Sequence, residues 1–110
     1  MKKIPWRGAR SAVAAMIVPA ALVCIPPAKA ADIFKGREAY ESHCQSCHGD
    51  DGRGRVANAP DFTRGQGLMA PDIALLRSIQ TGKGAMPAFR GLVRDRDMLD
   101  VVAFLRTFQR

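Results

Sequence analysis

The chain has 110 residues, a length that allows at most one small domain, and its formal net charge is +7. The charge is unevenly placed, because residues 1–30 hold five Lys or Arg and no acidic residue, whereas the remainder holds 12 basic and 10 acidic residues. A net charge of only +2 beyond residue 30 excludes a function that needs a strongly basic surface, such as nucleic-acid binding.

Residues 1–30 have the pattern of a secretory signal peptide. A basic stretch opens the chain, and an uncharged, mostly apolar run of 14 residues follows from Ala12 to Ile25. This run is shorter than the about 20 residues that a membrane-spanning helix needs, which favours a removable signal over a permanent anchor. Ala28 and Ala30 supply small residues at the two recognition positions. We therefore expect cleavage after Ala30, within about one residue, and export to the periplasm.

Cys24 lies inside the apolar run, where a lipoprotein attachment site is the alternative interpretation. Val23 precedes it at a position where a small residue would be expected, so we predict that Cys24 is removed with the signal peptide. The mature domain, residues 31–110, then contains two cysteines. A domain of this size has a marginal hydrophobic core. Such domains usually need a disulfide, a metal or a tightly bound cofactor.

The first predicted helix covers residues 32–47, with Asp32 as its N-cap. Gly36 falls on the same face as the apolar positions, and a glycine there predicts the close approach of another helix. The positions that share this face are Ile33, Gly36, Tyr40 and Cys44. Residues 49–67 are rich in glycine and show no apolar periodicity, so they are predicted to form a loop.

The second predicted helix covers residues 71–81, because Pro71 suits its first turn and Gly82 suits its C-terminal cap. Its predicted apolar side consists of Ile73, Leu75, Leu76 and Ile79. Residues 82–91 are predicted to be loop.

The last predicted helix covers residues 96–109. Asp97 and Asp100 lie near its start, where negative charge suits the helix dipole. Its apolar stripe consists of Met98, Val101, Val102, Leu105 and Phe108. The alternation typical of strands appears nowhere, so the predicted fold is all-α, with three to four short helices.

The most informative motif is Cys44-Gln45-Ser46-Cys47-His48, which has the C-x-x-C-H pattern of c-type haem attachment. Two thiols one helical turn apart can each add to one of the two neighbouring vinyl groups of haem. The next residue, His48, then lies beneath the iron and can ligate it through a neutral imidazole nitrogen. The motif predicts one covalent haem c.

Three other roles for Cys44 and Cys47 fit the sequence less well. A zinc site needs about four ligands, and the available cysteines and histidines, His43 included, lie within five consecutive positions. A thioredoxin-like pair would need a βαβ setting. A disulfide between these cysteines would close a very small loop for little gain in stability. His43 itself is interpreted as a surface or packing residue rather than as a second axial ligand.

The mature chain resembles the class I c-type cytochromes from Asp32 to Arg110. The resemblance rests on the attachment motif with Gly49, on Ala59-Pro60-Asp61-Phe62, on Gly84-Ala85-Met86-Pro87 and on the aromatic C-terminal helix. It implies the cytochrome c fold, in which the N- and C-terminal helices cross around one haem, with Gly36 and Tyr40 meeting side chains around Phe104.

The resemblance also implies a methionine as the second axial ligand of the iron. Met86 lies in a loop and matches the Met-Pro position, whereas Met69 is the reserve candidate and Met98 falls on the apolar stripe of the last helix. The predicted metal ligands are therefore His48 and Met86. The backbone carbonyl of Pro60 is expected to accept the remaining N–H of His48.

Two protein ligands fill both axial positions of the iron, which favours electron transfer over catalysis. We therefore predict a periplasmic electron carrier, not an enzyme, that exchanges electrons with redox partner proteins. It would be a monomer or belong to a redox complex, without a stable membrane insertion. The alternatives are a cytochrome c subunit of a larger dehydrogenase or oxidase, or a haem-based gas-binding or sensor domain. A peroxidase would need an open iron site or a second haem, and the sequence holds one C-x-x-C-H motif.

Overall fold

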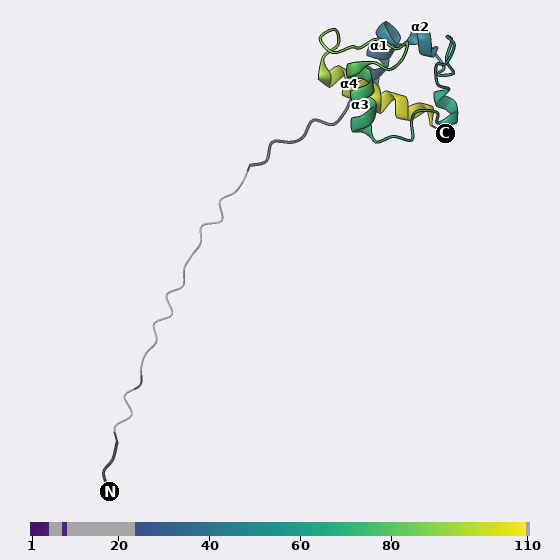
Figure 1. Ribbon diagram of the computed structural model, residues 1–110. Helices are drawn as coiled ribbons and strands as arrows, with labels where there is room; N and C mark the ends of the chain where they lie inside the picture. Colours follow the sequence, from purple (N-terminus) through teal and green to yellow (C-terminus); the bar gives the residue numbers. More distant parts are fainter. Residues whose placement is uncertain (5–7, 9–23, 110) are drawn as a thin grey trace.

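The computed structural model describes residues 1–4, 8 and 24–109 (Figure 1). Its helices are α1 (Ile33–His43), α2 (Gln45–His48), α3 (Asp72–Thr81) and α4 (Asp95–Leu105), with short 3-10 helices η1 (Phe62–Arg64) and η2 (Arg106–Phe108). Within these described residues, β-type hydrogen bonding is limited to two isolated bridges. The predicted all-α fold is confirmed.

Most of the predicted signal peptide, including residues 9–23 of its basic and apolar parts, lies outside the described residues. Cys24 is described and is an exposed free thiol. Among the residues that the structure describes, we find no helix with the length and apolarity required to cross a membrane.

Helix α1 begins where the sequence predicts, because the Asp32 carboxylate accepts hydrogen bonds from the N–H groups of Phe34 at 3.0 Å and Lys35 at 3.2 Å. The predicted continuous helix over 32–47 is nevertheless divided at Cys44. The φ angle of Cys44 is −118°, far from the about −63° of a regular helix. The chain changes direction there, and α2 starts as a separate short turn (Figure 1).

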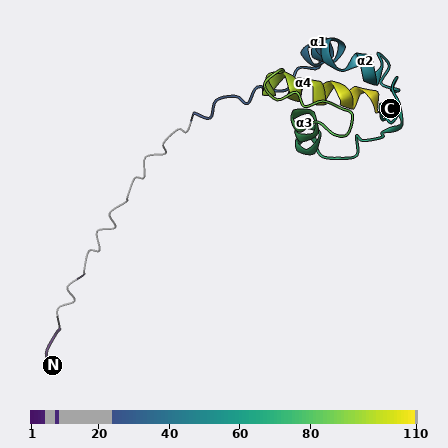
Figure 2. The same cartoon turned by 45° about the horizontal axis from the view of Figure 1, so that its top comes forward.

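The crossing of α1 and α4 depends on Gly36, as predicted. A Cβ atom at Gly36 would lie 2.0 Å from the backbone oxygen of Asp100 and 3.0 Å from Cβ of Phe104. One turn further along α1, the rings of Tyr40 and Phe104 meet edge to face, with centroids 5.2 Å apart. Figure 2 shows α1 lying against one side of α4 and α3 against another, so that α4 is central to the fold.

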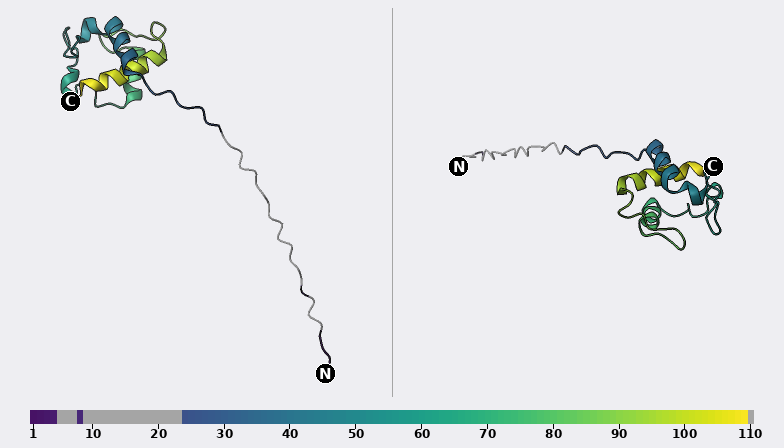
Figure 3. Two further views of the ribbon diagram at one scale, coloured as in Figure 1. Left: turned by 180° about the vertical axis from the view of Figure 1, so that it is seen from behind. Right: turned by 90° about the horizontal axis from the view of Figure 1, so that it is seen from above.

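The hydrophobic core lies where α4 meets α1 and α3. Figure 3 shows the loops that lead away from the two ends of α3. Met98 is fully buried, as predicted from the apolar stripe of the last helix. The buried core residues are Tyr40, Phe62, Leu68, Leu76, Ile79, Met98, Val101, Val102, Phe104 and Leu105.

Two sequence-based expectations about the faces of the helices are wrong. Ile33 and Ile73 are exposed, at 44% and 64%, and each lies in the first turn of its helix. Asp100 does not lie in the first turn of α4, where Asp95 and Asp97 lie, but one turn further on and buried. The early start of α4, at residue 95 instead of 96, accounts for part of this shift.

Candidate functional site

Helix α2 holds the three side chains of the attachment motif within one turn. The N–H of His48 donates to the carbonyl of Cys44 at 2.9 Å, which places the motif in helical geometry. Cys44 is half-buried and packs against the core, whereas Cys47 is exposed. Both are free thiols. The two sulfur atoms are thus available for separate bonds to a group that lies along α2.

Burial raises the pKa of the Cys44 thiol to about 11, and the neighbouring Cys47 adds to the effect. Cys44 is therefore protonated at neutral pH. Because thiol–disulfide exchange proceeds through the thiolate, this environment slows the formation of a disulfide by Cys44.

The imidazole of His48 stacks on the ring of Phe62, with centroids 4.9 Å apart and an angle of 19° between the planes. Burial lowers the pKa of His48 below its usual value, which keeps the ring neutral, the form that ligates a metal. Its Nδ1 atom is buried and has no hydrogen-bond partner among the described residues. The expected hydrogen bond to the carbonyl of Pro60 stays a prediction.

Sequence reasoning assigned no role to Phe62, the residue that positions the His48 ring. Phe62 begins η1, and its N–H donates to the carbonyl of Gly52 at 2.8 Å, which fixes the ring over α2. Phe62 also stacks on Phe108 of η2, with centroids 6.2 Å apart. The available signal was a single large aromatic side chain within a loop otherwise made of small and polar residues.

The loop after α2 folds back on the attachment motif. The N–H of Gly54 donates to the carbonyl of His48 at 2.9 Å, and the N–H of Arg55 donates to the carbonyl of Cys47 at 2.8 Å. From the other side, the buried hydroxyl of Tyr40 donates to the carbonyl of Gly49 at 2.6 Å. Burial raises the pKa of Tyr40 well above its ordinary value, so its phenol keeps the proton that it donates.

Met86 lies in a tight turn after α3. The N–H of Lys83 donates to the carbonyl of Met86 at 3.1 Å, and the N–H of Met86 donates back at 3.0 Å. Gly82 permits this turn, because its φ is +73° and a Cβ there would lie 2.6 Å from the carbonyl oxygen of Met86. Met86 is half-buried against the core, whereas Met69 is 88% exposed.

The end of α3 anchors the Met86 turn. The N–H of Phe89 donates to the carbonyl of Ile79 at 3.0 Å, and the N–H of Arg90 donates to the carbonyl of Gln80 at 3.2 Å. The Gln80 side chain continues the link by donating to a carboxylate oxygen of Asp95, at the start of α4, at 3.0 Å. The turn is therefore fixed to two helices of the core.

An apolar pocket joins the attachment motif to the segment that follows the Met86 turn. The rings of His43 and Phe89 form part of its lining and meet edge to face, with centroids 6.3 Å apart, and Cys44 also lines it. His43 is thus a packing residue at the surface, as predicted. The lining residues are Ala39, His43, Cys44, Ile79, Phe89, Val93, Met98 and Val101.

Of the predicted site residues, the structure places Cys44, Cys47 and His48 in one helical turn. Pro60 lies two residues before the ring that stacks on His48, and Met86 lies in a separate loop anchored to α3. In the part of the chain that the structure describes, no group of three or more His, Cys, Asp and Glu side chains converges on a metal site.

Comparison with known proteins shows the family of the chain. Residues 31–105 match the family described as "Cytochrome C oxidase, cbb3-type, subunit III". Cytochrome c6 of Thermosynechococcus vestitus is 34% identical over 84 residues, which cover 73% of each chain. The cbb3-type cytochrome c oxidase subunit FixP of Bradyrhizobium diazoefficiens is 37% identical over 70 residues, covering 61% of this chain and 24% of FixP. The solved structure of the KustC0563 c-type cytochrome has a TM-score of 0.62 and 23% identity, covering 68% of this chain and 98% of the other.

The fold and the attachment motif define a c-type cytochrome, and the chain belongs to the cytochrome c family. It is an electron carrier similar to cytochrome c6, not an enzyme, and the family implies a covalently bound haem c with its iron. The residues present fit this group. Two free thiols lie on one helical turn, a neutral histidine follows them, and the burial of the Nδ1 atom of His48 leaves the opposite ring nitrogen available to a metal.

Proposed function

We propose that this chain is exported to the periplasm, is cleaved after Ala30 and carries single electrons between redox proteins through one haem c. In this proposal the haem is bound covalently by Cys44 and Cys47, and its iron is ligated by His48 and Met86. The observation that carries the proposal is the geometry of the turn formed by Cys44 and α2, where two unbridged thiols and a half-buried neutral imidazole lie together.

The two cysteines are suited to attachment rather than to redox exchange between themselves. Each thioether forms when the S–H of a thiol adds across the C=C bond of one vinyl group, so the step needs neither an oxidant nor a leaving group. The half-buried Cys44 would hold the haem edge next to the core, and the exposed Cys47 would hold it at the surface. Two attachment points one turn apart would hold the haem against α2.

His48 and Met86 would hold the iron from the two faces of the haem. The Phe62 ring restricts rotation of the His48 imidazole, and the anchored turn after α3 restricts the position of Met86. When bound, the haem supplies one-electron exchange at its iron. A His/Met ligand pair raises the reduction potential relative to stronger donors, as does exclusion of water by the surrounding apolar side chains.

The test is covalent haem content, measured as a pyridine haemochrome spectrum of protein purified from cells that have haem-attachment machinery. Cys47→Ala leaves one attachment point, so we expect at most one thioether and a low yield of holoprotein. Ser46→Ala, on the same turn, is the control and should keep the wild-type yield. Normal covalent haem content in Cys47→Ala would contradict the assignment of the site.

A second candidate is a cytochrome c subunit of an oxidase complex. The match of residues 31–105 to a cbb3-type subunit family and the similarity to FixP favour it. Native mass measured on protein released from the periplasm without detergent distinguishes the two functions, because a free carrier elutes near the mass of its own chain. Rapid, tight binding of carbon monoxide by the reduced protein would instead indicate an open iron site and a gas-binding function.

A further inference from the structure

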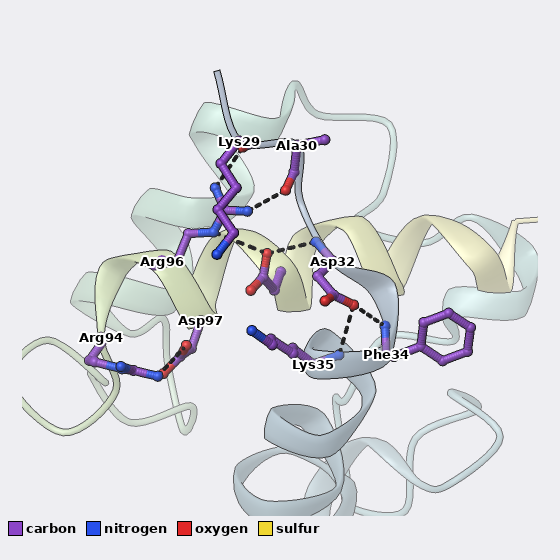
Figure 4. Close-up of polar contacts among 9 residues, drawn as sticks. Lys29, Ala30, Asp32, Phe34, Lys35, Arg94, Arg96 and Asp97 are labelled. Carbon is purple, nitrogen blue, oxygen red and sulfur yellow. Dashed lines mark hydrogen bonds and ion pairs between the residues drawn. The ribbon is translucent and has the colours of Figure 1, made fainter. Parts of the chain in front are cut away.

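A polar cluster ties the segment before α1 to α4, away from the site described above (Figure 4). The carboxylate of Asp100 is 1% exposed and accepts a hydrogen bond from the backbone N–H of Asp32 at 2.8 Å. The guanidinium of Arg96 lies 3.5 Å from the same carboxylate oxygen. Arg96 also donates to the carbonyl of Lys29 at 2.8 Å and to the carbonyl of Ala30.

The position of Asp100 is set by the helix crossing rather than by the cluster itself. Gly36 packs directly on the backbone of Asp100, so the register between α1 and α4 fixes this carboxylate beside the start of α1. A buried carboxylate is costly unless it is paired. Here its direct hydrogen-bond donor is a neutral N–H, and its cationic neighbour Arg96 is 38% exposed and shared with two carbonyl groups.

Cleavage after Ala30 would change both sides of this cluster. It removes the Lys29 and Ala30 carbonyls that Arg96 contacts, and it creates an α-ammonium group at Ala31. One residue spans about 3.5 Å, so the new cation lies next to the Asp32 N–H that already contacts Asp100. A start at Asp32 would place the ammonium nitrogen at that contact itself.

We propose that Asp100 is the binding site for the N-terminal ammonium group of the mature chain, which locks the start of α1 onto α4. The proposal rests on the cleavage position given under the proposed function. Removal of the signal peptide would therefore take two carbonyl acceptors away from Arg96 and bring a full positive charge next to the buried carboxylate of Asp100.

The charged groups around Asp100 come from both helices. Arg96 approaches from α4, and the Asp32 carboxylate, which caps α1, lies at the same corner. Lys35 of α1 faces Asp97, which forms an ion pair with Arg94 at 2.8 Å (Figure 4). Asp97 therefore serves as the matched control, because it is an acidic residue of the same helix with a different partner.

The experiment measures how fast the α-amino group of periplasmic holoprotein reacts with an acylating reagent at about pH 7.5, with peptide mapping of the first residue. Only the unprotonated amine reacts, and each unit of pKa corresponds to about tenfold less of it. Asp100→Asn keeps an acceptor for the Asp32 N–H and removes only the charge. We expect the wild type to react at least about threefold more slowly than Asp100→Asn, and Asp97→Asn to react like the wild type.

Equal rates in the wild type and Asp100→Asn would overturn the proposal, and so would an equal acceleration in Asp97→Asn. A mature chain that begins outside residues 31–32 by mass spectrometry would overturn it together with the cleavage position. The haem spectrum of the same preparation reports on the proposed electron-transfer function independently.

Wild-type holoprotein gives a second test should Asp100→Asn fail to fold. An α-amino group whose pKa is raised on folding stabilises the protein below its unfolded pKa of about 7.7, and this contribution is lost as the pH rises through the folded pKa. Acetylation of that group should therefore lower the urea midpoint at about pH 6.5 and leave it unchanged at about pH 10. Equal urea midpoints of the free and the acetylated protein at the lower pH would refute the proposed contact between the ammonium group and Asp100.

Discussion

The crossing of α1 with α4 and the segments that carry the proposed haem ligands, His48 and Met86, are held together in different ways. At the crossing, backbone packs on backbone, since Gly36 leaves no room for even a methyl group against Asp100. Around the ligands, the His48 ring depends on one stacked aromatic residue, and Met86 depends on a turn fixed by a few hydrogen bonds. The crossing is therefore fixed by contact between two helix backbones, whereas the two proposed ligands are held by fewer contacts.

This difference predicts where the protein tolerates change. Substitutions at the crossing should destabilise the fold whether or not haem is present, because they displace helix backbones. Substitutions at the loops should act mainly on the bound haem and on its iron, because few chain contacts depend on those side chains.

The largest effect on stability is expected for Gly36→Ala. The new Cβ would lie 2.0 Å from the carbonyl oxygen of Asp100, so the helices must separate, and overpacking of this kind costs about 3 kcal/mol. Urea unfolding of holoprotein measures it. Gly65→Ala is the control, because its φ is +74° but nothing lies within 4 Å, and it should cost only about 1 kcal/mol. A smaller loss at Gly36 than at Gly65 would contradict the assigned role of the crossing.

Met86→Ala tests the second region. We expect loss of the sulfur-to-ferric-iron charge-transfer band, a lower reduction potential, and about 2 kcal/mol lower stability from the half-buried thioether that is removed. An optical spectrum and a redox titration measure these changes. Met69→Ala should leave both unchanged, since that side chain is exposed. The opposite result would identify Met69 as the ligand.

Tyr40→Phe addresses the link between the two regions, because Tyr40 packs at the crossing while its hydroxyl reaches the loop after α2. The substitution leaves the Gly49 carbonyl without its 2.6 Å donor, which costs about 1–2 kcal/mol at a buried site. Urea unfolding measures the loss, and the haem spectrum should not change. A change in the haem spectrum would show that the hydrogen bond from Tyr40 to Gly49 also positions the attachment turn.

The smallest effect is expected for Arg94→Ala. The ion pair of Arg94 with Asp97 is at the surface, where solvent and salt screen the charges, although its Nε lies 2.8 Å from the carboxylate. We expect a urea midpoint indistinguishable from that of the wild type, at both low and high salt. A clear loss would mean that this corner of α4 supports the crossing after all.

Local patterns predicted the helices well and their environment less well. The Asp32 cap, the Gly82 end of α3 and the close approach at Gly36 follow from side-chain size and hydrogen bonding within a few residues, and each is confirmed. Periodicity predicted that Ile73 belongs to the apolar side of its helix, but Ile73 is exposed. A stripe of apolar residues does not show how many of its members the neighbouring helix covers. The break at Cys44, between α1 and α2, was missed, because the helical pattern of the sequence continues across it.

The sequence by itself determined the helical class of this protein, and it predicted a covalent haem c and the place in the chain where that haem would attach. These follow from the spacing of Cys44, Cys47 and His48 and from helical periodicity, which are local properties. Only the tertiary structure decided that Phe62 stacks on His48, that Met86 turns toward the core and that Asp100 is buried beside the start of α1. Each of these depends on contacts between segments far apart in the chain, which no local pattern encodes.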